Sequence, residues 1–252
     1  MKYGYNTCLF SLDEYARKFH KTYNRPFLFC FLMTHYQFQN YAKRVHIGKI
    51  ICLARTYKEH AREMNTIVTE NPLLFLKPES SVIFNHETII IPPMSTCLHH
   101  EIELGVIIGK NGKHITEEKA LQHVLGYLVA LDITARDIQS IAKKNGWPWG
   151  IAKGFDTFAP LSDAVLKENV PNPQNLDLVL KINGAIKQNA NTNQMIYSVD
   201  RIISFISEIM TLERGDLILT GTPEGVGEIK EGDILEAYLG SLCSLTVDVK
   251  HA

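Results

Sequence analysis

The sequence lacks the patterns on which several common protein classes depend. None of its five cysteines forms C-x-x-C and their count is odd, which favours reduced thiols and a cytoplasmic location, or a mitochondrial one if the source is eukaryotic. A net charge of −1 argues against a nucleic-acid partner, and no apolar run is long enough for a membrane helix. Because H-E-x-x-H, G-x-x-x-x-G-K-S/T and G-x-G-x-x-G are also missing, zinc peptidases and nucleotide-binding loops are disfavoured.

The N-terminal segment differs in composition from the rest of the chain. Residues 1–48 hold 12 of the 23 aromatic residues and only two acidic ones, Asp13 and Glu14. We therefore predict an aromatic-rich extension over 1–47 and one main domain over 48–252. A folded or frayed extension, an organelle-targeting presequence and a mis-chosen start codon all stay open. Because the candidate functional residues lie beyond Gly48, we expect the extension to be dispensable for chemistry.

Strand-like runs outnumber helical ones in the main domain, which predicts a mainly β fold with peripheral helices, of the α+β class. The Asn183-Gly184 pair, between two such runs, predicts a type I′ hairpin turn. The predicted strands cover 50–54, 73–76, 88–91, 99–108, 125–133, 176–182, 185–187, 216–219, 233–238 and 241–249, and the predicted helices cover 116–123, 136–144 and 198–210.

Two glutamates interrupt the apolar run at 99–108. In a strand, Glu101 and Glu103 point to the same face, where two carboxylates repel unless a cation lies between them. A third carboxylate, Asp132, ends a second apolar run. Three oxygen ligands without a thiolate suit Mg²⁺ or Mn²⁺, with Ca²⁺ as a further option. The alternative is that both glutamates line a solvated sheet face.

Two further pairs share helix faces. His60 and Glu63 are three residues apart, and a carboxylate that fixes an imidazole suits a general base acting on water. Arg136 and Gln139 follow Asp132 on the next predicted helix, where they could hold a substrate carboxylate beside a metal. Either pair can instead be an ordinary surface pair.

Two lysines and a glycine-rich loop complete the candidates. Lys153 is a possible anion contact and Lys77 a weaker one, although the usual interpretation of either lysine alone is a surface charge. The loop at 219–227 leaves a strand, and its backbone N–H groups and the Thr222 hydroxyl can bind a carboxylate or an oxyanion. An ordinary tight turn is the alternative.

Five motifs follow one another along the chain: L-F-L-K-P at 74–78, H-H-E-I-E-L-G-V at 99–106, L-D-I-T-A-R-D at 131–137, A-K-G-F-D at 152–156 and T-G-T-P-E-G-V-G at 220–227. In these motifs the chain, from about Gly48 to its end, resembles the fumarylacetoacetate hydrolase superfamily, and most of all its acylpyruvase and oxaloacetate decarboxylase branch. The resemblance covers about four-fifths of the chain. One departure is Ala54-Arg55-Thr56-Tyr57, where many relatives carry G-R-N-Y.

The resemblance implies a β-roll, a homodimer and a small 2-oxo or 2,4-dioxo acid as substrate. It also implies specific roles: metal ligation by Glu101, Glu103 and Asp132, catalysis by His60, Glu63 and Lys153, and substrate binding by Arg136, Gln139, Lys77 and Thr222.

The leading function hypothesis is metal-dependent hydrolysis of the C–C bond of acylpyruvates. In this scheme His60 takes a proton from water, which attacks the 4-keto carbon, and electrons flow into an enolate. Oxaloacetate decarboxylation is a possible second activity. An isomerase or tautomerase of 2-oxo diacids is the alternative at the same site, and a non-catalytic metal-stabilised binding protein is the alternative of another class.

Overall fold

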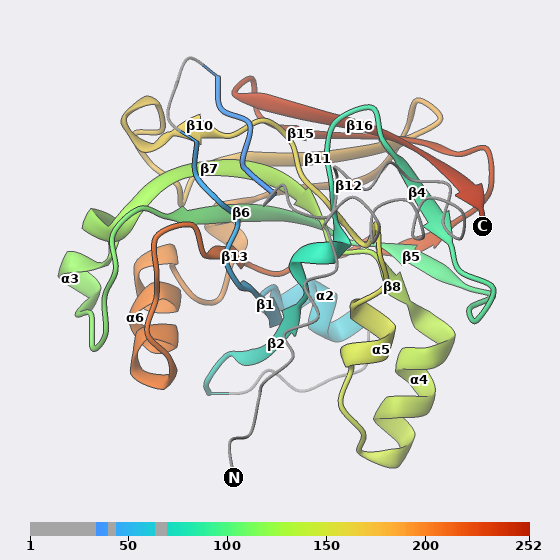
Figure 1. Cartoon of the computed structure of the whole chain (residues 1–252), viewed down its shortest axis with the longest axis horizontal. Coiled ribbons are helices and arrows are strands. Elements are labelled where there is room, and N and C mark those ends of the chain that lie inside the picture. The colour runs from blue at the N-terminus through green and yellow to red at the C-terminus, as the bar shows by residue number, and fades with distance from the viewer. Residues whose placement is uncertain (1–33, 40–43, 64–69) are drawn as a thin grey trace, which may run out of the picture. The chain divides into compact units, whose positions relative to one another are not determined.

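The computed structural model describes residues 34–39, 44–63 and 70–252 (Figure 1). Most of the predicted extension, up to residue 33, lies outside the described residues. Within them the strands outnumber the helices, which confirms the prediction of a mainly β fold.

Two main sheets form the domain, and Figure 1 shows the smaller of them above β6 and β7 of the larger. The larger sheet contains, in spatial order, β10 (Val165–Leu166), β7 (Val124–Leu131), β6 (Ile102–Ile108), β13 (Leu217–Leu219), β1 (Ile50–Ala54) and β2 (Leu73–Lys77). The smaller sheet contains β12 (Ala185–Asn191), β11 (Asp177–Ile182), β15 (Ile234–Leu239), β16 (Cys243–His251) and β4 (Thr88–Ile91).

Short sheets and helices surround these two. The short sheets are β14 (Gly227–Ile229) with β5 (Leu98–His100) and β8 (Thr134–Ala135), and β3 (Val82–Ile83) with β9 (Ala159–Pro160). The helices are α2 (Lys58–Glu63), α3 (Glu117–Ala120), α4 (Arg136–Asn145), α5 (Gly150–Lys153) and α6 (Val199–Ile209). Single 3₁₀ turns are η2 (Glu79–Ser81), η3 (Leu121–His123), η4 (Lys167–Asn169) and η5 (Thr192–Gln194). No helix among the described residues is long and apolar enough to cross a membrane.

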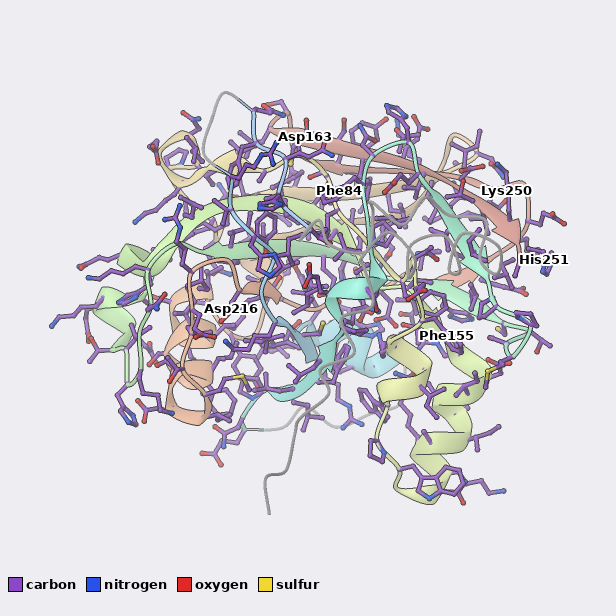
Figure 2. All side chains as sticks on the ribbon, in the orientation of Figure 1. Phe84, Phe155, Asp163, Asp216, Lys250 and His251 are labelled. Atoms are coloured by element: carbon purple, nitrogen blue, oxygen red, sulfur yellow. The ribbon has the colours of Figure 1, made fainter. Side chains whose placement is uncertain are left out.

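The central strands of the larger sheet, β7, β6, β13 and β1, are buried on both faces, because they send alternate apolar side chains into two clusters. One cluster includes Leu104 and Val129, together with residues of β11, β15 and α6. The other includes Ile50, Leu128 and Leu217 on the opposite face. Figure 2 shows side chains filling the space between the two main sheets. Burial on both faces explains why these strands read as nearly continuous apolar runs.

The predicted single strand over 99–108 is wrong in one respect. The chain changes sheets at Glu101: β5 pairs with β14 and β8, whereas β6 pairs with β7 and β13. The Asp132 N–H donates to the Glu101 carbonyl over 2.8 Å, so the sheet crossing lies directly beside the end of β7. The hairpin prediction is confirmed, since Asn183 and Gly184 have φ of 50° and 79° between β11 and β12.

Three residues before Gly48 belong to the core. Tyr36, Val45 and Ile47 are 5%, 3% and 0% exposed and pack in the second cluster. The Tyr36 hydroxyl also donates to the Gly215 carbonyl over 2.9 Å. The division at residue 48 stays a prediction, but this packing leads us to propose a boundary before Thr34.

Shortened proteins test this boundary. A chain that begins at Gly48 loses three buried side chains, each contributing about 1.5–3 kcal/mol of burial free energy. We expect its melting temperature to lie roughly 6 °C or more below that of a chain beginning at Thr34. Equal melting temperatures in calorimetry would restore the boundary at Gly48.

Candidate active site

Three buried carboxylates meet at the sheet crossing. Glu101 lies between β5 and β6, Glu103 lies within β6, and Asp132 follows β7. One oxygen from each lies within 4.8 Å of the others, and the residues are 7%, 1% and 0% exposed. The structure thus brings together the three predicted metal ligands, because β6 and β7 are antiparallel neighbours paired Ile102 to Leu131.

Two buried lysines neutralise part of this charge. Lys153, at the end of α5, places Nζ 2.9 Å from Glu101 Oε2 and 2.5 Å from Asp132 Oδ2. Burial alone would lower the pKa of Lys153, but Asp132 and Glu101 hold it well above the ordinary value, so the ammonium stays charged. Lys77, at the end of β2, lies 2.8 Å from Asp132 Oδ1 and donates to the carbonyls of Ile133 and Lys153.

Glu103 is the carboxylate without a cation in contact among the described residues. Its Oε2 accepts a hydrogen bond from the Gly221 N–H over 2.7 Å. Burial, followed by repulsion from Asp132 and Glu101, raises its pKa well above the ordinary value. A divalent cation among the three carboxylates would remove this repulsion.

The donor set fits a hard divalent cation. Its three carboxylates provide oxygen ligands only, and Glu103 carries the charge that the lysines leave unpaired. We therefore propose the cluster as the metal site, with Mg²⁺ as the expected ion and Mn²⁺ or Ca²⁺ as the alternatives.

Arg136 and Gln139 lie on the first turn of α4, beside the cluster. The Arg136 guanidinium is 2.5 Å from Glu101 Oε1 and donates to Gln139 Oε1 over 2.7 Å. Burial would raise the pKa of Glu101, but Lys153 and then Arg136 hold it well below its usual range. Both residues line the pocket, as a substrate-binding role requires.

His60 and Glu63 form the predicted pair on α2. His60 Nδ1 is 3.2 Å from Glu63 Oε2, and the histidine is only 8% exposed. The Gly225 N–H lies 3.2 Å from both Glu63 oxygens and holds the carboxylate in place. With Nδ1 paired to Glu63, Nε2 is the ring nitrogen left for the pocket.

The glycine-rich loop after β13 binds the protein's own carboxylates. Gly221 and Gly225 have φ of 90° and 89°, which side chains rarely adopt, and their N–H groups bond to Glu103 and Glu63. The loop therefore positions one proposed metal ligand and the orienting carboxylate of His60. Thr222 lines the pocket from the same loop.

Gln188 is a buried positioning residue that the sequence did not reveal. It lies in β12, donates to Thr222 Oγ1 over 2.9 Å and accepts from the Ile102 N–H over 3.1 Å. It ties the glycine-rich loop to the start of β6, beside Glu101. A polar residue in an exposed hairpin strand gives no pattern from which this role follows.

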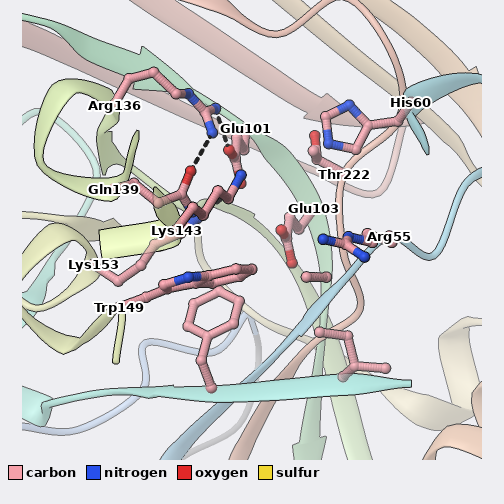
Figure 3. Close-up of a pocket in the computed structure, with 13 residues that line it drawn as sticks. Arg55, His60, Glu101, Glu103, Arg136, Gln139, Lys143, Trp149, Lys153 and Thr222 are labelled. Atoms are coloured by element: carbon pink, nitrogen blue, oxygen red, sulfur yellow. Dashed lines mark hydrogen bonds and ion pairs between the residues drawn. The ribbon is translucent and has the colours of Figure 1, made fainter. Parts of the chain in front are cut away.

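The pocket brings most of the candidates together. Figure 3 shows Arg136, Gln139, Lys143, Trp149 and Lys153 on one side, facing His60, Glu103, Arg55 and Thr222 on the other. Six lining residues were absent from the sequence candidates: Leu53, Ala54, Arg55, Phe75, Lys143 and Trp149.

Three candidates do not line this pocket. Asp132 contacts Lys153 at the pocket wall, Glu63 contacts His60, and Lys77 has a fully buried side chain behind Asp132. The predicted contact of Lys77 with substrate therefore has no support in this geometry. We propose instead that Lys77 positions Asp132.

Comparison with known proteins identifies the family. The family model described as fumarylacetoacetate (FAA) hydrolase C-terminal matches residues 49–250. The chain belongs to this family. The family resemblance predicted from the sequence motifs is thereby confirmed.

The names of individual relatives state different activities. Oxaloacetate tautomerase FAHD1, mitochondrial, from Mus musculus is 46% identical over 203 residues, which cover 81% of this chain and 92% of the relative. The structure of fumarylpyruvate hydrolase from Pseudomonas aeruginosa, in complex with Mn²⁺ and pyruvate, is 33% identical with a TM-score of 0.83, over 87% of this chain and 97% of that one. The 2-hydroxyhepta-2,4-diene-1,7-dioate isomerase of Mycobacterium marinum is 35% identical with a TM-score of 0.73, over 82% and 76% of the two chains. The family fold is confirmed, and an enzymatic function is supported.

Two matched substitutions test the electrostatics of the metal-free cluster. The raised pKa of Glu103 means that its ionised form opposes folding; the penalty is absent below the ordinary pKa of 4.5 and grows as the pH rises above it. Glu103→Gln should therefore melt higher than wild type at pH 8 in chelator, and the difference should vanish near pH 4.

Glu101→Gln is the opposite case. It takes a partner from two cations, Lys153 and Arg136, and should lower the free energy of unfolding by about 3 kcal/mol at pH 8. If both variants shift the melting temperature in the same direction, the contrast between a Glu101 stabilised by two cations and a Glu103 destabilised by repulsion is wrong.

Proposed function

We propose that the protein is an oxaloacetate tautomerase, which interconverts the keto and enol forms of this 2-oxo diacid. The observation that carries the proposal is the charged Lys153 ammonium at the pocket wall, between Glu101 and Asp132 and across the pocket from the imidazole of His60 (Figure 3). Enolisation needs such a positive site for the developing oxyanion and a base for the carbon-bound proton. The names of relatives at 44–46% identity support the same reaction.

In this scheme, different residues of the site hold the metal, bind the substrate carboxylate and transfer the proton. A divalent cation held by Glu101, Glu103 and Asp132 would polarise the 2-oxo group and favour the enolate. Arg136 and Gln139 bind the adjacent carboxylate. Glu63 fixes the ring of His60, whose Nε2 takes the proton from C3 of the keto form. Protonation of the resulting enolate at its 2-oxygen, by that imidazolium or by solvent, gives the enol, and the reverse sequence returns a proton to C3.

Hydrolysis of the C–C bond of acylpyruvates is the second candidate. The His60–Glu63 pair favours it, because an oriented imidazole can take a proton from water and so start the attack on the 4-keto carbon. The structural neighbour named fumarylpyruvate hydrolase supports this candidate too. Decarboxylation of oxaloacetate would use the same positive site without water. A non-catalytic binding role has no such support.

The remaining expectations concern assembly and location. The homodimer stays a prediction, as does the cytoplasmic location, with mitochondria as the alternative. A small 2-oxo acid is the proposed partner, and neither a nucleic acid nor a membrane is proposed.

A substrate panel separates the two candidates. Purified protein with Mg²⁺ or Mn²⁺ should ketonise enol-oxaloacetate faster than it cleaves acetylpyruvate or fumarylpyruvate. Chelator should abolish all three rates. Cleavage of an acylpyruvate with no effect on enol-oxaloacetate would establish the hydrolase instead, and full activity in excess chelator would remove the metal from the mechanism.

His60→Ala tests the proton-transfer role. Loss of a general base should lower tautomerisation and any acylpyruvate hydrolysis by roughly 100-fold or more. Decarboxylation should fall much less. Glu59→Gln, an exposed neighbour on α2, is the matched control and should leave the rates unchanged. Wild-type tautomerisation in His60→Ala would show that His60 carries no proton in this reaction.

A further inference from the structure

Lys143 extends the basic face of α4 beyond the two predicted substrate contacts. Arg136, Gln139 and Lys143 are spaced three and four residues apart, so they share one face of the helix. All three line the pocket. At 1.5 Å per residue, Lys143 begins about 10 Å farther along the helix axis than Arg136. It therefore approaches the pocket away from the helix end that contacts Glu101.

No protein carboxylate pairs with Lys143 in the part of the chain that the structure describes. Glu101, a carboxylate that lines the same pocket, already contacts Arg136 through one oxygen and Lys153 through the other. The Lys143 ammonium instead lies 5.2 Å from the ring centroid of Trp149, which also lines the pocket. This ring is a platform that directs the ammonium without neutralising it.

The pocket wall carries more positive than negative side chains. Its cations are Arg55, Arg136, Lys143 and Lys153, whereas its carboxylates are Glu101 and Glu103. The imbalance affects Lys143, because partial burial, and then repulsion from Arg136, lowers its pKa to about 8. A cation in this position is stabilised by an anion that enters from solvent.

We propose that Lys143 binds the distal carboxylate of a dicarboxylate 2-oxo acid and thereby determines the preference of the enzyme for dianionic substrates. The proposal rests on the proposed function, because it assigns Arg136 and Gln139 to the carboxylate next to the 2-oxo group. We place the second carboxylate toward Lys143, because it is a pocket-wall lysine that no described carboxylate pairs with. A substrate with an uncharged tail would leave the ammonium unpaired, so the site would bind it less tightly.

A pair of substrates and three variants test Lys143. Oxaloacetate and 2-oxosuccinamate differ only at C4, where the second has a neutral amide of similar shape. Lys143→Gln should raise KM for oxaloacetate roughly 10-fold or more, the scale of one charge-assisted hydrogen bond, with little change in kcat. It should leave 2-oxosuccinamate unaffected. Lys143→Arg should restore most of the preference, and Lys144→Gln, an exposed neighbour on α4, should behave as wild type.

A binding measurement separates this proposal from the proposed function. The chain has two tryptophans, and Trp149 lines the pocket, so a fluorescence titration with Mg²⁺ present yields dissociation constants without turnover. A 10-fold fall in the ratio of the two affinities in Lys143→Gln supports Lys143 even if no tautomerisation is found. An unchanged ratio, or equal weakening of both ligands, overturns the role of Lys143 whether or not the enzyme tautomerises oxaloacetate.

Discussion

The ion pairs of Lys153 with Glu101 and Asp132 are the interaction on which the rest of the site depends. Buried charges are tolerated only when they are paired, so these contacts fix α5 against the sheet crossing and the end of β7. Lys77 also attaches the end of β2 to this cluster, because its Nζ lies 2.8 Å from Asp132 Oδ1. Four segments distant in sequence thus meet at one cluster. Glu103 remains the member whose charge is left for a metal.

The glycine-rich loop supplies a second constraint from the opposite side. Two glycines with positive φ direct their N–H groups at Glu103 and Glu63, so one loop orients both the metal cluster and the pair that contains His60. A carboxylate held by a backbone donor keeps its position without a long, flexible cation. The loop therefore acts as a rigid support, and Thr222 is its contribution to the pocket surface.

The sequence predicted that the three carboxylates lie together, because the apolar runs around them indicate strands and the side chains of a strand alternate between its two faces. Alternation along a strand puts Glu101 and Glu103 on one face, and a carboxylate at the end of an apolar run marked Asp132. It did not reveal the sheet change at Glu101, since hydrophobic alternation continues across it. The sequence also does not distinguish a lysine buried behind the cluster, such as Lys77, from a lysine at the pocket rim, such as Lys143. That distinction depends on which elements pack around each side chain.

The central claim is that the three carboxylates hold a divalent metal ion, and anomalous diffraction from crystals grown with Mn²⁺ tests it most directly. The prediction is one strong peak about 2–2.5 Å from an oxygen of each of Glu101, Glu103 and Asp132, with Lys153 still paired to at least one of them. A fully active protein whose crystals show no peak at the cluster under saturating Mn²⁺ would contradict the claim.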